Sequence, residues 1–119
     1  GAAVTYSNEA KVNLLHVAPH TLETEGAVSE QTVQEMAEGA KRIFHTDYAI
    51  ATSGIAGPTG GTDTKPVGMV CIAVAGRFET LVKTYYFKND RTINIERSAV
   101  AGLTMLYNLF KKEYMLDVE

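Results

Sequence analysis

The feature that most constrains the fold is an almost unbroken apolar run over residues 66–76, PVGMVCIAVAG. A run of this length without alternation predicts a strand buried on both faces at the centre of a sheet. Gly76 and Arg77 then mark a turn, and the alternating residues 78–87, FETLVKTYYF, predict the second arm of a hairpin. Cys71, within the run, is expected to be a small core residue and not a nucleophile.

Three helices are predicted upstream of this hairpin. Ser7 is a candidate N-cap for a short helix over residues 8–16, and residues 19–25 form a second one that Gly26 terminates. Ser29 is the expected N-cap of the clearest helix, whose apolar stripe consists of Val33, Met36, Ala37, Ala40 and Ile43.

One long helix is predicted downstream, where Asn89 and Asp90 open it. Apolar residues recur in it at helical spacing, so they are expected to face the sheet. This expected buried stripe consists of Ile95, Ala99, Leu103, Leu106 or Tyr107, Phe110 and Tyr114.

Two further strands are expected, over residues 1–6 and over residues 47–54. The resulting order predicts one α/β domain over residues 1–119, a three-layer α/β/α arrangement with a mixed sheet. Two long amphipathic helices and a buried central strand need a larger sheet than four strands supply. The fold is therefore expected to be short of material at its N-terminal side.

Composition excludes several classes of function. The net charge of −3 disfavours a nucleic-acid surface, and no apolar run approaches the roughly 18 residues of a membrane helix. A single cysteine excludes a disulfide framework and suits a reducing cytoplasm. His16 and His20 are four residues apart, but Pro19 lies between them, so no metal site or other cofactor is expected.

The segment TSGIAGPTGGTDTKPVG, residues 52–68, holds five of the ten glycines. Glycines and small hydroxyl residues between two strands form either a surface turn or a nest of backbone N–H groups that binds an anion. Lys65 would supply the counter-charge. The segment is not a Walker loop, because the lysine precedes a strand and not a helix. Both interpretations stay open on the residues alone.

Several short motifs together resemble one known family. They are VTYSNEAK, AVSE before the clearest helix, SGIAGPTGG followed by KPVG, and NDR before the last helix. In this order, over nearly the whole chain, they closely resemble the C-terminal domain of the CinA family, the nicotinamide-nucleotide amidases of PncC type. The resemblance implies a cytoplasmic bacterial amidohydrolase. Its small-molecule partner would be nicotinamide mononucleotide, converted into nicotinic acid mononucleotide and ammonia.

The resemblance also implies roles for particular residues. The family has a serine–lysine catalytic pair, whose lysine matches Lys11, with a nearby tyrosine that matches Tyr6. The arginine of NDR matches Arg91 and is expected to bind phosphate. The glycine segment is expected to line the nucleotide site through Ser53, Gly54, Gly57, Gly60, Gly61, Thr62 and Lys65. On the residues alone, Lys11 is also interpretable as a solvated helix lysine, Tyr6 as a core aromatic and Arg91 as a surface residue.

The nucleophilic serine of the family belongs to a strand-to-helix motif, Glu-Ser-Cys-Thr-Gly-Gly, upstream of the position that Gly1 matches. No such motif occurs in these 119 residues, so this chain alone is expected to be inactive. Two alternatives stay open. The chain is a non-catalytic nucleotide-binding or regulatory module, or it is an assembly domain whose exposed sheet edge pairs with another copy in a homo-oligomer.

Overall fold

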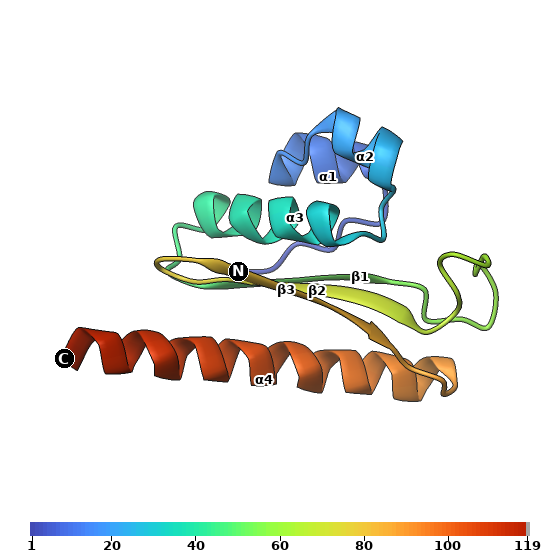
Figure 1. Cartoon of the computed structure of the whole chain (residues 1–119). Helices are drawn as coiled ribbons and strands as arrows, with labels where there is room; N and C mark the ends of the chain where they lie inside the picture. The colour runs from blue at the N-terminus through green and yellow to red at the C-terminus, as the bar shows by residue number, and fades with distance from the viewer. Residues whose placement is uncertain (119) are drawn as a thin grey trace.

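The computed structural model describes residues 1–118, which form three layers (Figure 1). One helix covers one face of a sheet, two shorter helices pack on the outer side of that helix, and one long helix covers the other face of the sheet. The predicted three-layer α/β class is confirmed. In chain order the elements are α1 Asn8–Leu15, α2 Pro19–Glu25, α3 Glu30–Ile43, β1 Ala49–Gly54, β2 Met69–Ala75, β3 Thr80–Tyr86 and α4 Arg91–Val118.

The strands follow one another in the sheet in the order β1-β2-β3, and both pairings are antiparallel. The mixed sheet that the sequence predicts is therefore not found in the part of the chain that the structure describes. The missing strand is the one predicted over residues 1–6, which has no regular structure. An extended segment becomes a strand only when a neighbour takes its backbone hydrogen bonds. Here the Thr5 carbonyl instead accepts a hydrogen bond from the side chain of Lys11, through Nζ at 2.8 Å.

The hydrophobic core lies between α3 and the sheet. Every residue of β2 is buried, as the unbroken apolar run predicts. The expected stripe of α3 is confirmed, since Val33, Met36 and Ala37 are buried and Ala40 and Ile43 pack partly against them. Cys71 is also buried, and this burial raises the pKa of its thiol, which fits a core residue.

Side chains near the helix starts hold α2 and α3 in place. The Ser29 hydroxyl accepts a hydrogen bond from the Thr32 N–H at 3.1 Å, so the predicted N-cap of α3 is confirmed. Glu35 of α3 accepts hydrogen bonds of 2.7 Å from the Ala18 N–H and the Thr21 hydroxyl. One carboxylate therefore ties the first turn of α2 to the middle of α3.

The orientation of α4 differs from the sequence prediction. Within residues 91–115, the buried residues of this helix are Asn94, Gly102, Leu109 and Glu113, so a face with a glycine and two polar residues packs on the sheet. Gly102 permits this, because an added Cβ would lie only 3.3 Å from Ile50. The predicted buried stripe was wrong: Leu106 is half-buried, and the exposed members are Ile95, Ala99, Leu103, Tyr107, Phe110 and Tyr114.

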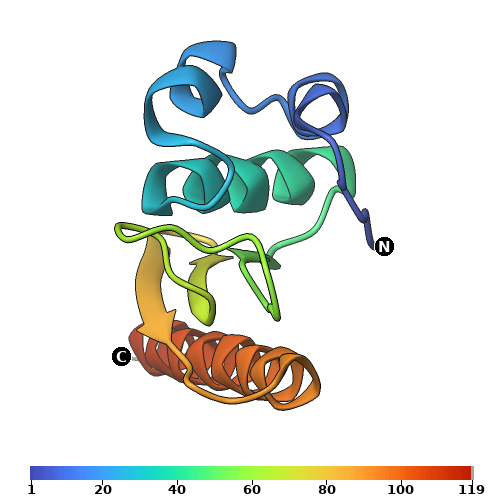
Figure 2. The same ribbon diagram turned by 90° about the vertical axis from the view of Figure 1, so that its right-hand side faces the viewer.

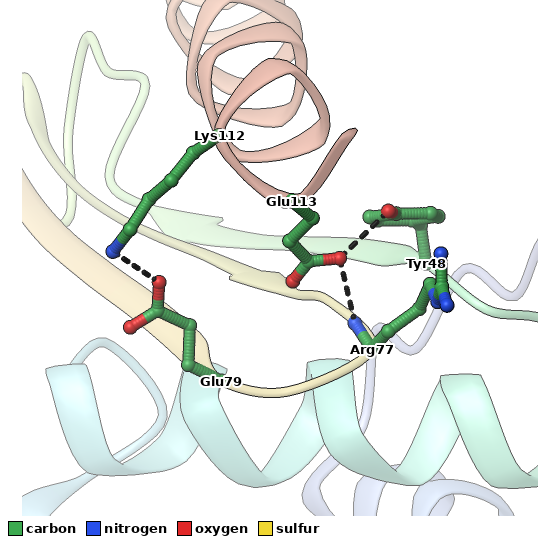
Figure 3. Close-up of polar contacts among 5 residues, drawn as sticks. All are labelled: Tyr48, Arg77, Glu79, Lys112 and Glu113. Atoms are coloured by element: carbon green, nitrogen blue, oxygen red, sulfur yellow. Dashed lines mark hydrogen bonds and ion pairs between the residues drawn. The ribbon is translucent and has the colours of Figure 1, made fainter. Parts of the chain in front are cut away.

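Glu113 anchors the C-terminal part of α4 to the sheet (Figure 3). Its Oε1 accepts hydrogen bonds from the Tyr48 hydroxyl at 2.7 Å and from the Arg77 N–H at 3.1 Å. On the exposed side, Lys112 pairs with Glu79 at 2.7 Å. These contacts fix α4 to the chain just before β1 and to the turn after β2.

At 28 residues, α4 is the longest helix of the described chain. It spans about 42 Å and extends past one end of the sheet (Figure 1). Neither α4 nor any other helix within residues 1–118 combines the length and apolar character needed to span a membrane.

Candidate functional site

Two hollows adjoin along β1, one on each face of the sheet. The first, of about 610 Å³, lies on the side of α1 and α3 and is lined by residues 1–6, Lys11 and Ser53 among others. The second, of about 690 Å³, lies on the side of α4 and includes Arg91. Tyr6, Ile50, Thr52 and Gly54 line both hollows, so the two meet at the edge of this strand.

Lys11 enters the first hollow from α1. The Ser7 hydroxyl caps this helix through the Ala10 N–H at 3.0 Å, which places Lys11 one turn into it and facing inward. The side chain is only 6% exposed, and this burial lowers the pKa of its amine below the ordinary lysine value. The structure therefore rules out the interpretation of Lys11 as a solvated surface lysine.

Tyr6 lies at the mouth of both hollows but is not a core aromatic. Its side chain is 94% exposed, and Lys11 donates its hydrogen bond to Thr5 and not to the tyrosine hydroxyl. The structure thus brings Tyr6 to the same place as Lys11 without a contact between the two polar groups.

The glycine loop, residues 55–68, lies between the upper helices and the start of α4 (Figure 2). Ser53 of β1 and Lys65 of the loop both form hydrogen bonds with the chain that precedes α3. The Ser53 hydroxyl donates to the Ala27 carbonyl at 2.7 Å, and Lys65 Nζ donates to the Glu25 carbonyl at the end of α2. The Lys65 amine therefore lies at the C-terminal end of α2, where the helix dipole favours a positive charge. It is also the positive charge that is expected to bind an anion.

Backbone geometry explains most of the loop glycines. Gly57 and Gly60 have positive φ angles of 94° and 99°. Gly54 and Gly61 lie so close to neighbouring chain that a side chain would collide with it. Thr62 closes a turn, since its hydroxyl accepts from the Lys65 N–H at 3.0 Å. The residues Gly57, Gly60, Gly61, Thr62 and Lys65 line neither of the two hollows.

Arg91 joins the loop to the first turn of α4. One guanidinium nitrogen donates to the Gly57 carbonyl at 3.1 Å, and the side chain is otherwise exposed beside the second hollow. Its neighbour Asn94, which was not among the predicted site residues, is fully buried and donates to the Ala56 carbonyl at 3.0 Å. The one signal in the sequence is a polar residue at a position of α4 that faces the sheet. That signal was hidden because the predicted inward face of this helix did not include Asn94.

The site thus combines an amine whose pKa is lowered with a guanidinium at a helix N-terminus. A neutral amine can accept a proton from a nucleophile, and a guanidinium beside free helix N–H groups can bind phosphate. Across residues 1–118, no three His, Cys, Asp or Glu side chains gather where they could hold a metal ion.

Fold and site together define a three-layer α/β domain with a hollow on each face of one edge strand. The family model for the CinA C-terminal domain matches residues 1–110, and the chain belongs to this family. The resemblance expected from the motifs is confirmed.

Relatives and solved structures agree with this membership. A CinA-like protein of Desulforapulum autotrophicum is 53% identical over 88% of this chain and 25% of its own length. A competence/damage-inducible protein of Agrobacterium tumefaciens has a solved structure with a TM-score of 0.85 and 42% identity, over 89% of this chain and 66% of that one. The corresponding protein of Enterobacter asburiae gives a TM-score of 0.82 and 45% identity, over 87% and 65%. This chain spans about a quarter of the length of the curated relatives that it matches.

Proposed function

We propose that this chain, together with a serine that lies outside its 119 residues, hydrolyses the amide of nicotinamide mononucleotide, giving nicotinic acid mononucleotide and ammonia in the cytoplasm. The observation that carries the proposal is the buried amine of Lys11 in the hollow beside β1. A serine–lysine mechanism needs a lysine that is neutral often enough to act as a base, and burial lowers the pKa of Lys11.

In this mechanism Lys11 takes the proton of a serine hydroxyl while the serine oxygen attacks the amide carbon. The protonated amine then gives the proton to the leaving nitrogen, which departs as ammonia. Water hydrolyses the resulting ester to nicotinic acid mononucleotide and restores the serine. The hydrogen bond from Lys11 Nζ to the Thr5 carbonyl, at 2.8 Å, orients the amine in either protonation state.

Arg91 supports a nucleotide as the substrate class. Its guanidinium uses one hydrogen bond to fix itself to Gly57, and the exposed remainder lies at the start of a 28-residue helix. A phosphate placed there would receive charge-assisted hydrogen bonds from the guanidinium and from backbone N–H groups.

The serine is proposed to come from a strand-to-helix segment that pairs with the free edge of β1. Within residues 1–118, β1 pairs only with β2, and its sequence AIATSG carries no charge and no proline. Edge strands that face solvent usually carry a charged residue or a proline that prevents pairing with another strand, and exposed Lys83 is such a residue in β3 at the opposite edge. The apolar side chains of Ile95 and Leu103 line the hollow next to this edge, where a helix after the added strand would cover them.

The test is ammonia release from nicotinamide mononucleotide by the complete gene product. Lys11→Ala should lower kcat at least about 10³-fold, because the base is lost. Lys111→Ala, which changes an exposed lysine of α4, should leave kcat unchanged. The 119-residue chain by itself should release no ammonia.

Two results would argue against the proposal. Lys11→Ala with nearly parental kcat would remove the lysine from the mechanism. Binding of nicotinamide mononucleotide without any ammonia release would make the domain a nucleotide-binding module.

A further inference from the structure

We propose that Asn94 is a positioning residue that holds the Ala56–Gly57 corner of the glycine loop where Arg91 can present its guanidinium to a phosphate. This inference rests on the proposed function for the identity of the ligand. The proposed reaction does not use Asn94, and its side chain is nevertheless 0% exposed.

The carboxamide of Asn94 is occupied by backbone groups from two segments. Its Nδ2 donates to the Ala56 carbonyl and to the Asn89 carbonyl, each at 3.0 Å. Its Oδ1 accepts from the Asn89 N–H at 3.2 Å. A buried amide is tolerated only when such bonds are made, and no other side chain of this size both donates twice and accepts. The bonding pattern therefore selects asparagine for a specific backbone arrangement.

Arg91 and Asn94 act on neighbouring atoms. They are three residues apart at the start of α4, so their side chains leave the helix on the same face. They bind consecutive carbonyls of the loop, with Arg91 on Gly57 at 3.1 Å and Asn94 on Ala56 at 3.0 Å. The Asn94 bond sets the position of the corner, and the corner in turn sets the direction of the guanidinium.

The helix start is itself held rigid at this point. Asp90 Oδ1 accepts from the Ile93 N–H at 3.0 Å, and the Asp90 carbonyl accepts from the Asn94 N–H at 2.9 Å. Asn94 is thus fixed to the cap of α4 through its main chain and to the loop through its side chain. Loss of its side chain would release the loop while leaving the helix cap in place.

The experiment compares Asn94→Ala with Thr104→Ala in this chain, by amide hydrogen exchange without ligand and by titration with nicotinamide mononucleotide. Thr104 lies on the same helix, is exposed and lines neither hollow. In Asn94→Ala, loop amides should exchange at least about tenfold faster and the Kd should rise by about tenfold. Thr104→Ala should change neither quantity.

The exchange rates and the Kd together distinguish the positioning role of Asn94 from the identity of the substrate. Parental exchange rates in the loop of Asn94→Ala would overturn the positioning role, whatever the parent binds. Faster exchange together with a parent that does not bind the mononucleotide would keep the positioning role and overturn the proposed substrate. Faster exchange with an unchanged Kd in a parent that does bind would show that Asn94 holds the loop but not the ligand site, and would overturn the inference.

A measurement on the parent covers the case in which Asn94→Ala does not fold. Addition of nicotinamide mononucleotide should slow exchange of the Asn94 side-chain amide protons together with that of the loop amides. In a parent that titration shows to bind the mononucleotide, slowing confined to the loop, or no slowing at either place, would contradict the inference.

Discussion

The Tyr48 hydroxyl donates a 2.7 Å hydrogen bond to Oε1 of Glu113, which lies 65 residues further along the chain (Figure 3). The acceptor is a buried carboxylate, so this bond is charge-assisted and shielded from water. It joins the segment before β1 to the far part of α4, and the backbone of Arg77 adds a second donor to the same oxygen.

Tyr48→Phe should lower the free energy of unfolding by about 2 kcal/mol, because it takes a donor from a buried carboxylate. Tyr107→Phe is the matched control, since Tyr107 is exposed on α4 and should change stability by less than about 0.5 kcal/mol. Urea unfolding of both variants measures the difference. Equal effects would mean that the Tyr48 bond does not anchor α4.

Glu113 should make stability depend on acid. Burial alone would raise the pKa of its carboxyl, but hydrogen bonds from the Tyr48 hydroxyl and the Arg77 N–H outweigh burial and hold the pKa below its ordinary value. The contribution is complete above the unfolded value of about 4.3 and is lost as the pH falls through the lower folded value.

Glu113→Gln removes this titration. The stability difference between parent and variant should therefore shrink as the pH is lowered from neutral to about 3. Urea unfolding at several pH values measures it. A difference that stays constant, or grows in acid, would contradict the lowered pKa.

Gly68→Ala should be far more harmful than Gly60→Ala. Both glycines have positive φ, of 93° and 99°, so both substitutions carry the strain of about 1–2 kcal/mol that a side chain meets there. At Gly60 the nearest atom to an added Cβ is 3.8 Å away, whereas at Gly68 the Cβ would overlap the Phe87 carbonyl. The difference in Tm between the variants isolates the collision, and similar Tm values would show that the end of β3 can move aside.

The face that α4 turns to the sheet can be tested with a pair of leucines. Leu109 is 1% exposed and Leu103 is 60% exposed. Leu109→Ala should cost about 3 kcal/mol through loss of buried surface and a cavity, and Leu103→Ala less than about 0.5 kcal/mol. A larger cost at Leu103 would restore the orientation predicted from the sequence.

Lys11 should make stability rise with pH on the alkaline side. Burial lowers the pKa of its folded-state amine, so the unfolded chain binds more protons between that value and the ordinary one of about 10.4. The parent should gain stability relative to Lys11→Met as the pH rises through this range. Exposed Lys111→Met supplies the baseline, and parallel curves for the two variants would contradict a lowered pKa.

The sequence predicted those elements whose determinants are local. Ser7 and Ser29 cap helices, Gly26 ends α2, and an unbroken apolar run forms the buried strand β2, all as expected. These features depend on residues within one or two turns of each other, so a pattern in the sequence is sufficient to find them.

The orientation of α4 could not be predicted in the same way. Periodicity places the larger apolar residues inward. The helix instead buries Gly102, which allows close approach to the sheet, and Asn94 and Glu113, whose hydrogen-bond partners include Ala56 and Tyr48. Those partners are far away in the sequence, and so the stabilisation of a buried polar face is invisible to a local pattern.

The structure brings some of the predicted site residues together. Lys11, Tyr6, Ser53, Gly54 and Arg91 do line the two hollows along β1. Their roles in catalysis and binding stay predictions. Gly57, Gly60 and Gly61 are predicted from the sequence to line the nucleotide site. In the structure, positive φ angles at Gly57 and Gly60 and the close contact at Gly61 determine the path of the backbone.

The strand order β1-β2-β3 has a consequence for the time course of folding. Residues 76–79 link β2 to β3, whereas residues 55–68 link β1 to β2. Closing the longer connection costs about 1 kcal/mol more in chain entropy, so we expect the β2–β3 hairpin to form in the transition state and β1 to join later. The glycine loop and the corner beside Arg91 would then be the last parts to assemble, and their substitutions would change the unfolding rate more than the folding rate.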